Sequence, residues 1–157
     1  MKIEFWVIGK TSFAYLTEGM QLYEKRITRY LPFSSIVIPD VKNAKNLSQE
    51  ELKKKEGQLI LKKIEKNDLL ILLDENGKTF TSIKFSKWLE QQLQHSARKM
   101  IFIVGGAYGF SEEVYARANG KISLSNMTFS HQMIRLFFLE QLYRALTIMK
   151  NEPYHHR

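Results

Sequence analysis

Short apolar runs that alternate with helix-like segments set the strongest limit on how this 157-residue chain can fold. The runs Leu69–Leu73 and Met100–Val104 are apolar without interruption, which is typical of strands covered on both faces of a parallel sheet. Between such runs, apolar residues recur at three- and four-residue steps, the periodicity of an amphipathic helix. This alternation predicts an α/β fold with an open, mostly parallel sheet and helices on both faces.

The same patterns predict individual elements along the chain. Strands are expected at residues 2–9, 33–39, 69–73, 100–104 and 121–124, and helices at 12–31, 48–66, 82–94, 111–118 and from 129 or 130 to about 151. Ser48 followed by Glu51 is a capping box, and Asn76-Gly77 is expected to form a turn after the third strand. The length is that of one domain, so residues 1–157 are expected to form a single domain.

Composition narrows the possible chemistry and partners. The chain has no cysteine, which excludes disulfides, thiolate nucleophiles and zinc–thiolate sites. Its net charge of +8 favours a polyanionic partner such as RNA or DNA, although many basic proteins bind no polyanion. The N-terminus does not resemble a signal peptide, and no stretch is apolar enough to cross a membrane. We therefore expect a cytoplasmic protein.

Three segments that end a predicted strand are candidate walls of a ligand pocket, because ligands of such sheets bind beyond the carboxyl ends of the strands. These segments are Leu73-Asp74, Gly105-Gly106 and Leu124-Ser125. Glycines in Gly105–Gly109 let backbone amides approach a ligand, and the helix that follows favours an anion. The spacing is neither Gly-x-Gly-x-x-Gly nor a phosphate loop, which counts against a dinucleotide oxidoreductase. A tight turn without a ligand is the alternative.

The segment Leu124–Phe129 joins the last predicted strand to the last helix, and it is neither strand-like nor strongly turn-like. Its backbone groups could hold an adenine, since recognition by the backbone needs no special side chain. An ordinary connector is the alternative.

The C-terminal part carries further candidate residues. The last helix is apolar nearly all round, so we expect it in the core or at a subunit contact. Glu140 and Arg144 are four residues apart and are expected to pair, whereas Arg135 needs a partner if it is buried. The basic, aromatic tail Tyr154–Arg157 could stack on a base and neutralise phosphate, or it could have no role. No metal site is expected, because adjacent histidines are poorly spaced as ligands.

Four motifs, taken together, are similar to those of a known family. They are Ile-Val-Gly-Gly-Ala-Tyr-Gly (103–109), Leu-Ser-Asn-Met-Thr-Phe-Ser-His-Gln-Met-Ile-Arg (124–135), Glu-Gln-Leu-Tyr-Arg-Ala (140–145) and Tyr-His (154–155). In this combination, and over its whole length, the chain resembles the ribosomal RNA large subunit methyltransferase H family, a minimal branch of the SPOUT class. One departure is Ser130, which stands where proline is commoner before the histidine, and it leaves the rigidity of this loop open.

The resemblance implies both a fold and an activity. It implies a deep trefoil knot in the C-terminal half, a feature that few proteins have, and a homodimer whose site lies between subunits. It implies transfer of a methyl group from S-adenosyl-L-methionine to N3 of a pseudouridine in the decoding-site helix of 23S rRNA, on the assembled ribosome. Another SPOUT enzyme that acts on tRNA or on a ribose hydroxyl, and a non-catalytic ribosome-binding module, remain alternatives.

Carried over by motif, the resemblance also implies site residues. The cofactor would contact Leu73, Gly105, Leu124, Ser125, Asn126, Met127, Thr128 and Phe129. Tyr154 and His155 match the family's functional tail. Because the sulfonium methyl is already activated, the protein would mainly align an in-line transfer. A neutral His155 is expected to take the N3 proton, Arg144 or Arg157 to stabilise the developing charge, and Tyr154 to stack on or orient the base.

Overall fold

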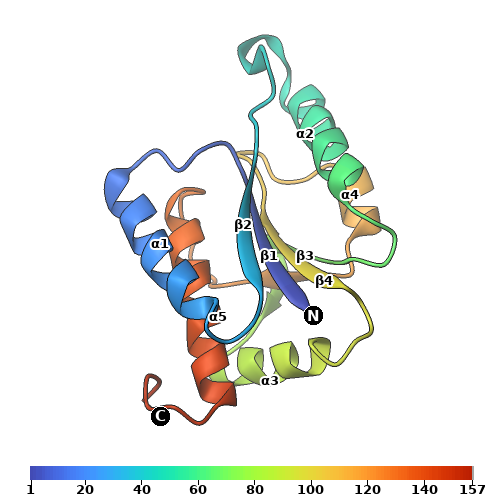
Figure 1. The fold of residues 1–157 in the computed structure, drawn as a ribbon. Coiled ribbons are helices and arrows are strands. Elements are labelled where there is room, and N and C mark those ends of the chain that lie inside the picture. The colour runs from blue at the N-terminus through green and yellow to red at the C-terminus, as the bar shows by residue number, and fades with distance from the viewer. Residues whose placement is uncertain (157) are drawn as a thin grey trace.

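The apolar runs form a five-stranded sheet in the computed structural model, which describes residues 1–156 (Figure 1). The strands are β1 (Lys2–Ile8), β2 (Phe33–Ile38), β3 (Leu69–Thr79), β4 (Lys99–Val104) and β5 (Gly120–Ser123). They lie in the order β2-β1-β4-β3-β5, and neighbouring strands are parallel throughout. The predicted open, parallel sheet is therefore confirmed.

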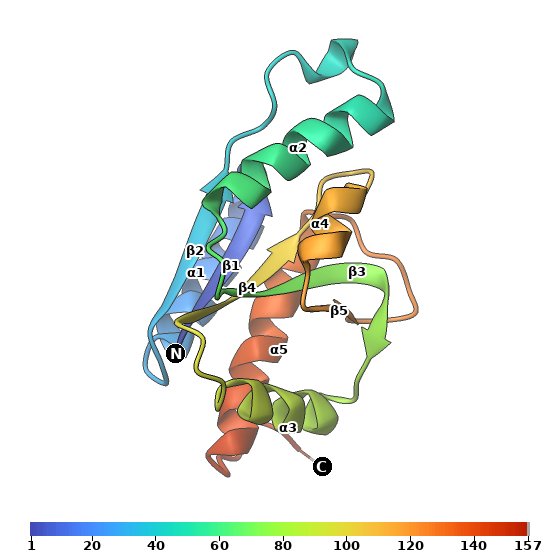
Figure 2. The ribbon, with the colours of Figure 1, turned by 90° about the vertical axis from the view of Figure 1, so that its right-hand side faces the viewer.

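Helices cover both faces of this sheet, as predicted (Figures 1 and 2). They are α1 (Ala14–Ile27), α2 (Gln49–Lys63), α3 (Ser82–Gln92), α4 (Glu112–Arg117) and α5 (Met133–Met149), with a 3-10 turn at Ala44–Asn46. α1, α3 and α5 pack on one face, and α2 and α4 pack on the other. Within residues 1–156, none of the helices has both the length and the apolar character needed to cross a membrane. The trefoil knot stays a prediction.

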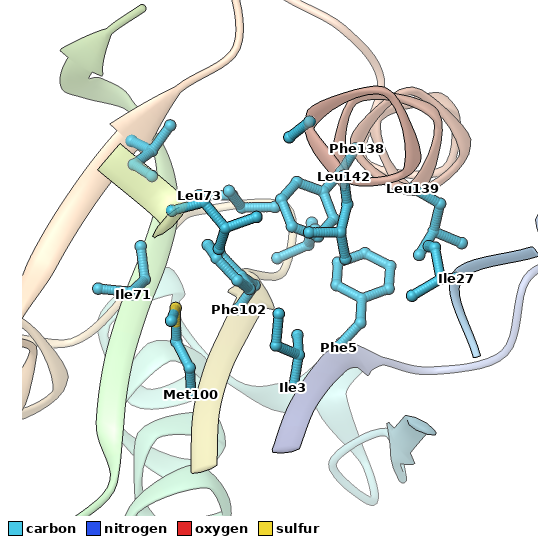
Figure 3. Packing of buried hydrophobic residues seen from close by; sticks show 14 of the residues in the cluster. Ile3, Phe5, Ile27, Ile71, Leu73, Met100, Phe102, Phe138, Leu139 and Leu142 are labelled. Carbon is cyan, nitrogen blue, oxygen red and sulfur yellow. The ribbon is translucent and has the colours of Figure 1, made fainter. Parts of the chain in front are cut away.

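Three aromatic rings fix α5 over the middle of the sheet (Figure 3). The ring of Phe138 lies with its centroid 4.9 Å from that of Phe5 on β1 and 4.9 Å from that of Phe102 on β4. All three side chains are fully buried. Burying an aromatic side chain of this size contributes roughly 1.5–3 kcal/mol to the free energy of unfolding. These contacts therefore fix the position of α5 on the sheet.

Local hydrogen bonds set where the helices begin. The predicted capping box of α2 is present, because the Glu51 amide donates to the Ser48 hydroxyl at 3.1 Å and the Ser48 amide donates to the Glu51 carboxylate at 3.3 Å. α5 begins at Met133, later than the expected 129 or 130. The Met133 amide donates to the Ser130 hydroxyl at 3.1 Å, which satisfies the backbone before the helix starts.

The turn predicted at Asn76-Gly77 is wrong, because β3 continues to Thr79. The pairing of β3 with β5 shifts register between Leu73 and Lys78, so residues 74–77 bulge out of the ladder. A Cβ atom on Gly77 would lie 2.6 Å from backbone atoms of Ile122, so only glycine allows this close approach. Asn-Gly marks a bulge here, although the same dipeptide is common in tight turns.

Arg135 ties α5 to the carboxyl end of β1. Its guanidinium is almost fully buried and donates to the carbonyl oxygens of Ile8 at 2.8 Å and Gly9 at 2.9 Å, and to the Thr11 hydroxyl at 3.1 Å. Burial lowers the pKa of Arg135, while the negative charge of Asp40 opposes this shift. The end of β1 and the Thr11 hydroxyl therefore serve the two terminal nitrogens of Arg135, whereas its Nε has no hydrogen-bond partner among residues 1–156.

Replacing this arginine should weaken the fold substantially. Arg135→Leu removes the three donated hydrogen bonds and leaves two carbonyl groups buried without their donors, so we expect a loss of about 3 kcal/mol in the free energy of unfolding. Urea denaturation measures this loss, with Arg29→Leu as the matched control because Arg29 is exposed. A loss no larger than that of the control would show that Arg135 does not anchor α5.

Candidate functional site

The carboxyl ends of β3, β4 and β5 open into a cavity of about 570 Å³, called the first cavity below. Gly105 and Leu124 directly follow β4 and β5, Leu73 is the last residue of β3 that pairs with β4, and all three residues line this cavity. The three segments predicted to wall a pocket therefore meet at one place. The volume lies in the range of sites that hold a small-molecule ligand or cofactor. Arg135 occupies the end of β1 by donating to the Ile8 carbonyl, and the first cavity lies over β3, β4 and β5.

The glycine segment forms one wall of the first cavity with its backbone. A Cβ atom on Gly106 would lie 2.7 Å from both carboxylate oxygens of Glu56, which leaves no room for a side chain on that side. Gly57 in α2 and Ser111 at the start of α4 are also in close contact behind the wall. The backbone of this segment is therefore held between α2 and the cavity, where its polar groups can face a ligand.

Glu56 is a buried carboxylate behind this wall, and its side chain is 8% exposed. Burial, together with the negative charge of Asp40, raises the pKa of Glu56 to about 6. The sequence analysis missed this residue, because Lys53–Lys55 immediately before it are typical of a solvated helix face. Only the packing of α2 against the glycine segment reveals it.

The bulge at residues 74–77 also lines the first cavity, with Asp74, Glu75 and Asn76. The Tyr115 hydroxyl donates to the Asp74 carboxylate, and burial and this contact raise the pKa of Tyr115 to about 12. Tyr115 therefore remains a protonated donor at neutral pH. Two carboxylates at the rim favour a ligand that carries positive charge.

The segment Leu124–Phe129 contributes most of the remaining predicted contacts. The Met127 amide donates to the Ser125 hydroxyl at 3.0 Å, and the Ser123 hydroxyl donates to the Ser125 carbonyl at 2.9 Å. Of the predicted cofactor contacts, Leu73, Gly105, Leu124, Ser125, Met127, Thr128 and Phe129 line the first cavity. Asn126 does not line it.

The predicted residues Arg144, Tyr154 and His155 form a second group with Glu140, called the tail group below, and none of these four residues lines the first cavity. Glu140 lies at its centre and accepts hydrogen bonds from Arg144 Nε at 3.1 Å and from the Tyr154 hydroxyl at 3.0 Å. The predicted pairing of Glu140 with Arg144 is therefore confirmed. Arg144 Nη1 also lies 3.0 Å from His155 Nδ1. Arg157, the remaining candidate, lies outside the residues that the structure describes.

The contact between Arg144 and His155 determines which ring nitrogen carries hydrogen. A guanidinium can only donate, so His155 Nδ1 is the acceptor, and a neutral His155 carries its hydrogen on Nε2. Burial and the hydrogen bonds to Tyr23 and Glu140 raise the pKa of Tyr154, so its hydroxyl stays protonated. In this position, His155 has no free basic nitrogen to offer to a substrate.

Comparison with known proteins shows which family this chain resembles in sequence and which solved structure it resembles in fold. A family model described as "Predicted SPOUT methyltransferase" matches residues 1–155. A protein of Parabacteroides distasonis named Ribosomal RNA large subunit methyltransferase H is 58% identical over 156 residues, 99% of each chain. Its namesake in Flavobacterium johnsoniae is 54% identical over 157 residues, 100% of each chain. The solved structure of a probable methylase family protein from Haemophilus influenzae has a TM-score of 0.52 at 9% identity, over 95% of this chain and 66% of that one, which is a likeness of fold alone.

The buried carboxylate predicts a pH-dependent cost to stability. Because the pKa of Glu56 is raised from 4.5 to about 6 in the folded protein, its ionisation destabilises the fold; the cost appears between these pH values and is complete above them. Glu56→Gln should therefore gain up to about 2 kcal/mol relative to the wild type between pH 4 and pH 7. Urea denaturation at several pH values measures this, with exposed Glu113→Gln as the control. A difference that does not change with pH would contradict the buried charge.

Proposed function

The chain belongs to the SPOUT methyltransferase family, and from this premise we propose that it transfers a methyl group from S-adenosyl-L-methionine to N3 of a pseudouridine in 23S rRNA. Membership confirms the resemblance found in the sequence, and it makes the chain an enzyme. The observation that carries the proposal is the near-full-length identity to relatives named Ribosomal RNA large subunit methyltransferase H. That name favours ribosomal RNA over tRNA as the substrate.

The first cavity supports S-adenosylmethionine as the methyl donor. Its apolar strand ends suit an adenine ring, and the carboxylates of Asp74 and Glu75 suit a ligand with a sulfonium and an ammonium group. We propose that Leu73, Gly105, Leu124, Ser125 and residues 127–129 hold the donor, largely through backbone groups. When bound, the donor supplies a methyl group that is already activated by its sulfonium, so the protein's task is alignment.

The charge of the chain supports a polyanionic substrate. Its net charge is +8, and α2 exposes Lys54, Lys55, Lys62 and Lys63 to solvent. Lysines on an exposed helix face can neutralise RNA phosphates. We propose the assembled ribosome, at the decoding-site helix of the large subunit, as the substrate, and the cytoplasm as the place where the enzyme meets it.

The separation of the tail group from the first cavity supports a homodimer. In one chain, Tyr154 and His155 do not line the cavity that would hold the methyl donor. α1 packs beside α5 and leaves apolar side chains exposed, among them Tyr15 at 61% and Leu22 at 47%. We propose that each chain is a single domain, that a second copy covers this face, and that its tail completes the site.

The contacts of the tail suggest how the N3 proton is removed. In the reaction, the N3–methyl bond forms as the methyl–sulfur bond breaks, and the N3 proton must go to a base. His155 Nδ1 is blocked by Arg144 in the present arrangement. We propose that Arg144 moves from His155 to a carbonyl oxygen of the bound base, which frees Nδ1 to take the N3 proton, and that Arg144 then stabilises the negative charge that develops on this oxygen as the proton leaves. Tyr154, held as a donor, would orient the ring.

The proposal is tested by methyl transfer from labelled S-adenosylmethionine to ribosomes that lack the modification, with free 23S rRNA and tRNA alongside. Mass spectrometry of the digested RNA locates the methyl group. We expect N3-methylpseudouridine in ribosomes and little in free RNA, because a site this small needs the ribosome to complete it. Transfer only to tRNA, or to a ribose hydroxyl, would show a different SPOUT activity.

The role of the tail predicts a split between turnover and donor binding. His155→Ala should lower single-turnover methyl transfer to ribosomes by about 100-fold, since general base catalysis is typically worth that much or more. The affinity for S-adenosylmethionine, measured by calorimetry, should not change, because in the proposed reaction His155 contacts the target base and not the donor. His156→Ala is the matched control on the adjacent, exposed histidine. An equal loss of turnover and of donor affinity would indicate a structural tail instead.

A further inference from the structure

A second cavity of about 230 Å³ lies beside the first, between α3, α5 and the end of β3. Both cavities are lined by Ile122, Ser123, Leu124 and Phe129. The segment that begins at Leu124 therefore borders both, and a group in the second cavity lies next to whatever the first one holds. Neither the sequence motifs nor the family resemblance assigned a role to this space.

The apolar side of the second cavity is aromatic. It is lined by Phe80, Phe85, Phe129 and Phe137. The rings of Phe129 and Phe137 lie with their centroids 5.0 Å apart, and both residues remain about a third exposed, although large apolar side chains are usually buried. Unstacked nucleic-acid bases are commonly held against aromatic side chains of this kind. A volume of about 230 Å³ suits one nucleic-acid base, whereas S-adenosylmethionine, with its adenosine and methionine parts, needs more room.

The polar side of the second cavity presents one amide in a fixed orientation. The Ser82 hydroxyl donates to Gln141 Oε1 at 2.8 Å, and Gln141 Nε2 donates to Glu140 Oε2 at 3.2 Å. An amide oxygen accepts two hydrogen bonds and an amide nitrogen donates two. Among residues 1–156, the side-chain amide of Gln141 accepts one hydrogen bond, from Ser82, and donates one, to Glu140. One acceptor position on Oε1 and one hydrogen on Nε2 therefore stay free. Gln141 therefore offers the cavity an acceptor and, beside it, a donor.

We propose that the second cavity receives the target base and that Gln141 distinguishes pseudouridine from uridine; this inference rests on the proposed function. Pseudouridine is joined to ribose through C5, so its ring keeps an N1–H next to the C2 carbonyl. A uridine in the same position has a C–H where the N1–H would be. Gln141 Oε1 accepts from N1–H and Nε2 donates to the C2 carbonyl, a pairing that uridine cannot complete.

This placement agrees with the position of the atom that reacts. N3 follows C2 in the ring, so a base held by N1 and C2 against Gln141 can turn N3 towards Leu124–Phe129 and the first cavity. Ser82 and Glu140 act as positioning residues, because they hold the amide of Gln141 in the orientation that recognition requires. Glu140 also accepts hydrogen bonds from Arg144 and Tyr154 of its own chain.

The experiment compares two sets of ribosomes, one with pseudouridine and one with uridine at the target position. Methyl transfer gives kcat/KM for each set, and their ratio measures discrimination. We expect the wild type to favour pseudouridine by about tenfold or more, as one hydrogen bond supplies, and Gln141→Leu to bring the ratio close to unity. Ser82→Ala should give an intermediate ratio. Gln91→Leu, an exposed glutamine on α3 that lines neither cavity, should keep the wild-type ratio.

The affinity for S-adenosylmethionine separates recognition from loss of fold. Gln141 does not line the first cavity, so Gln141→Leu should bind the donor as the wild type does. If Gln141→Leu fails to bind S-adenosylmethionine, the ratio measured for Ser82→Ala tests whether the orientation of Gln141 controls discrimination. An unchanged ratio in both variants, an equal loss on both ribosome sets, or a wild type without discrimination would each overturn the inference and leave the proposed function standing. A wild type that methylates neither set would overturn both.

Discussion

The buried guanidinium of Arg135 is the contact on which the functional part of this structure depends. It donates to the last carbonyl groups of β1 and so fixes the start of α5 at the carboxyl edge of the sheet. A buried charge is costly unless its donors are satisfied, and strand ends supply unpaired carbonyl groups. Successive turns of the same helix then carry Phe137, Gln141 and Arg144. One anchored helix thereby sets the spacing of the second cavity and the tail group relative to the first cavity.

Two stretches of backbone, residues 74–77 and the segment at Gly106, form walls of the cavity over β3, β4 and β5. Residues 74–77 leave the ladder between β3 and β5, and the contact of Gly77 with Ile122 makes that departure possible. In the second stretch, the backbone at Gly106 rests on the carboxylate of Glu56. Backbone walls of this kind suit a ligand that is recognised by shape and peptide groups.

The proposed reaction involves four charged or polar side chains whose contacts compete. Glu140 binds Arg144 and Tyr154, and Arg144 binds His155. As long as Arg144 stays on His155 Nδ1, the histidine is a donor at its other nitrogen and cannot act as a base. A carbonyl oxygen of the bound base is the natural competitor for Arg144, so the substrate itself would release the histidine. This coupling would keep the tail inactive until RNA is bound.

Sequence patterns were enough to predict five parallel strands, although not the extension of β3 to Thr79, and both helical layers, because apolar periodicity is a local property. They also predicted that Leu73, Gly105 and Leu124 meet, because parallel strands run towards one edge of the sheet. The sequence likewise predicted the pairing of Glu140 with Arg144, which is local to one helix. The tertiary structure alone decided that residues 74–77 bulge, that Glu56 supports Gly106, and that Ser82 orients Gln141, 59 positions away. These contacts join residues far apart in the chain, and no pattern within one element records which partner another element will bring.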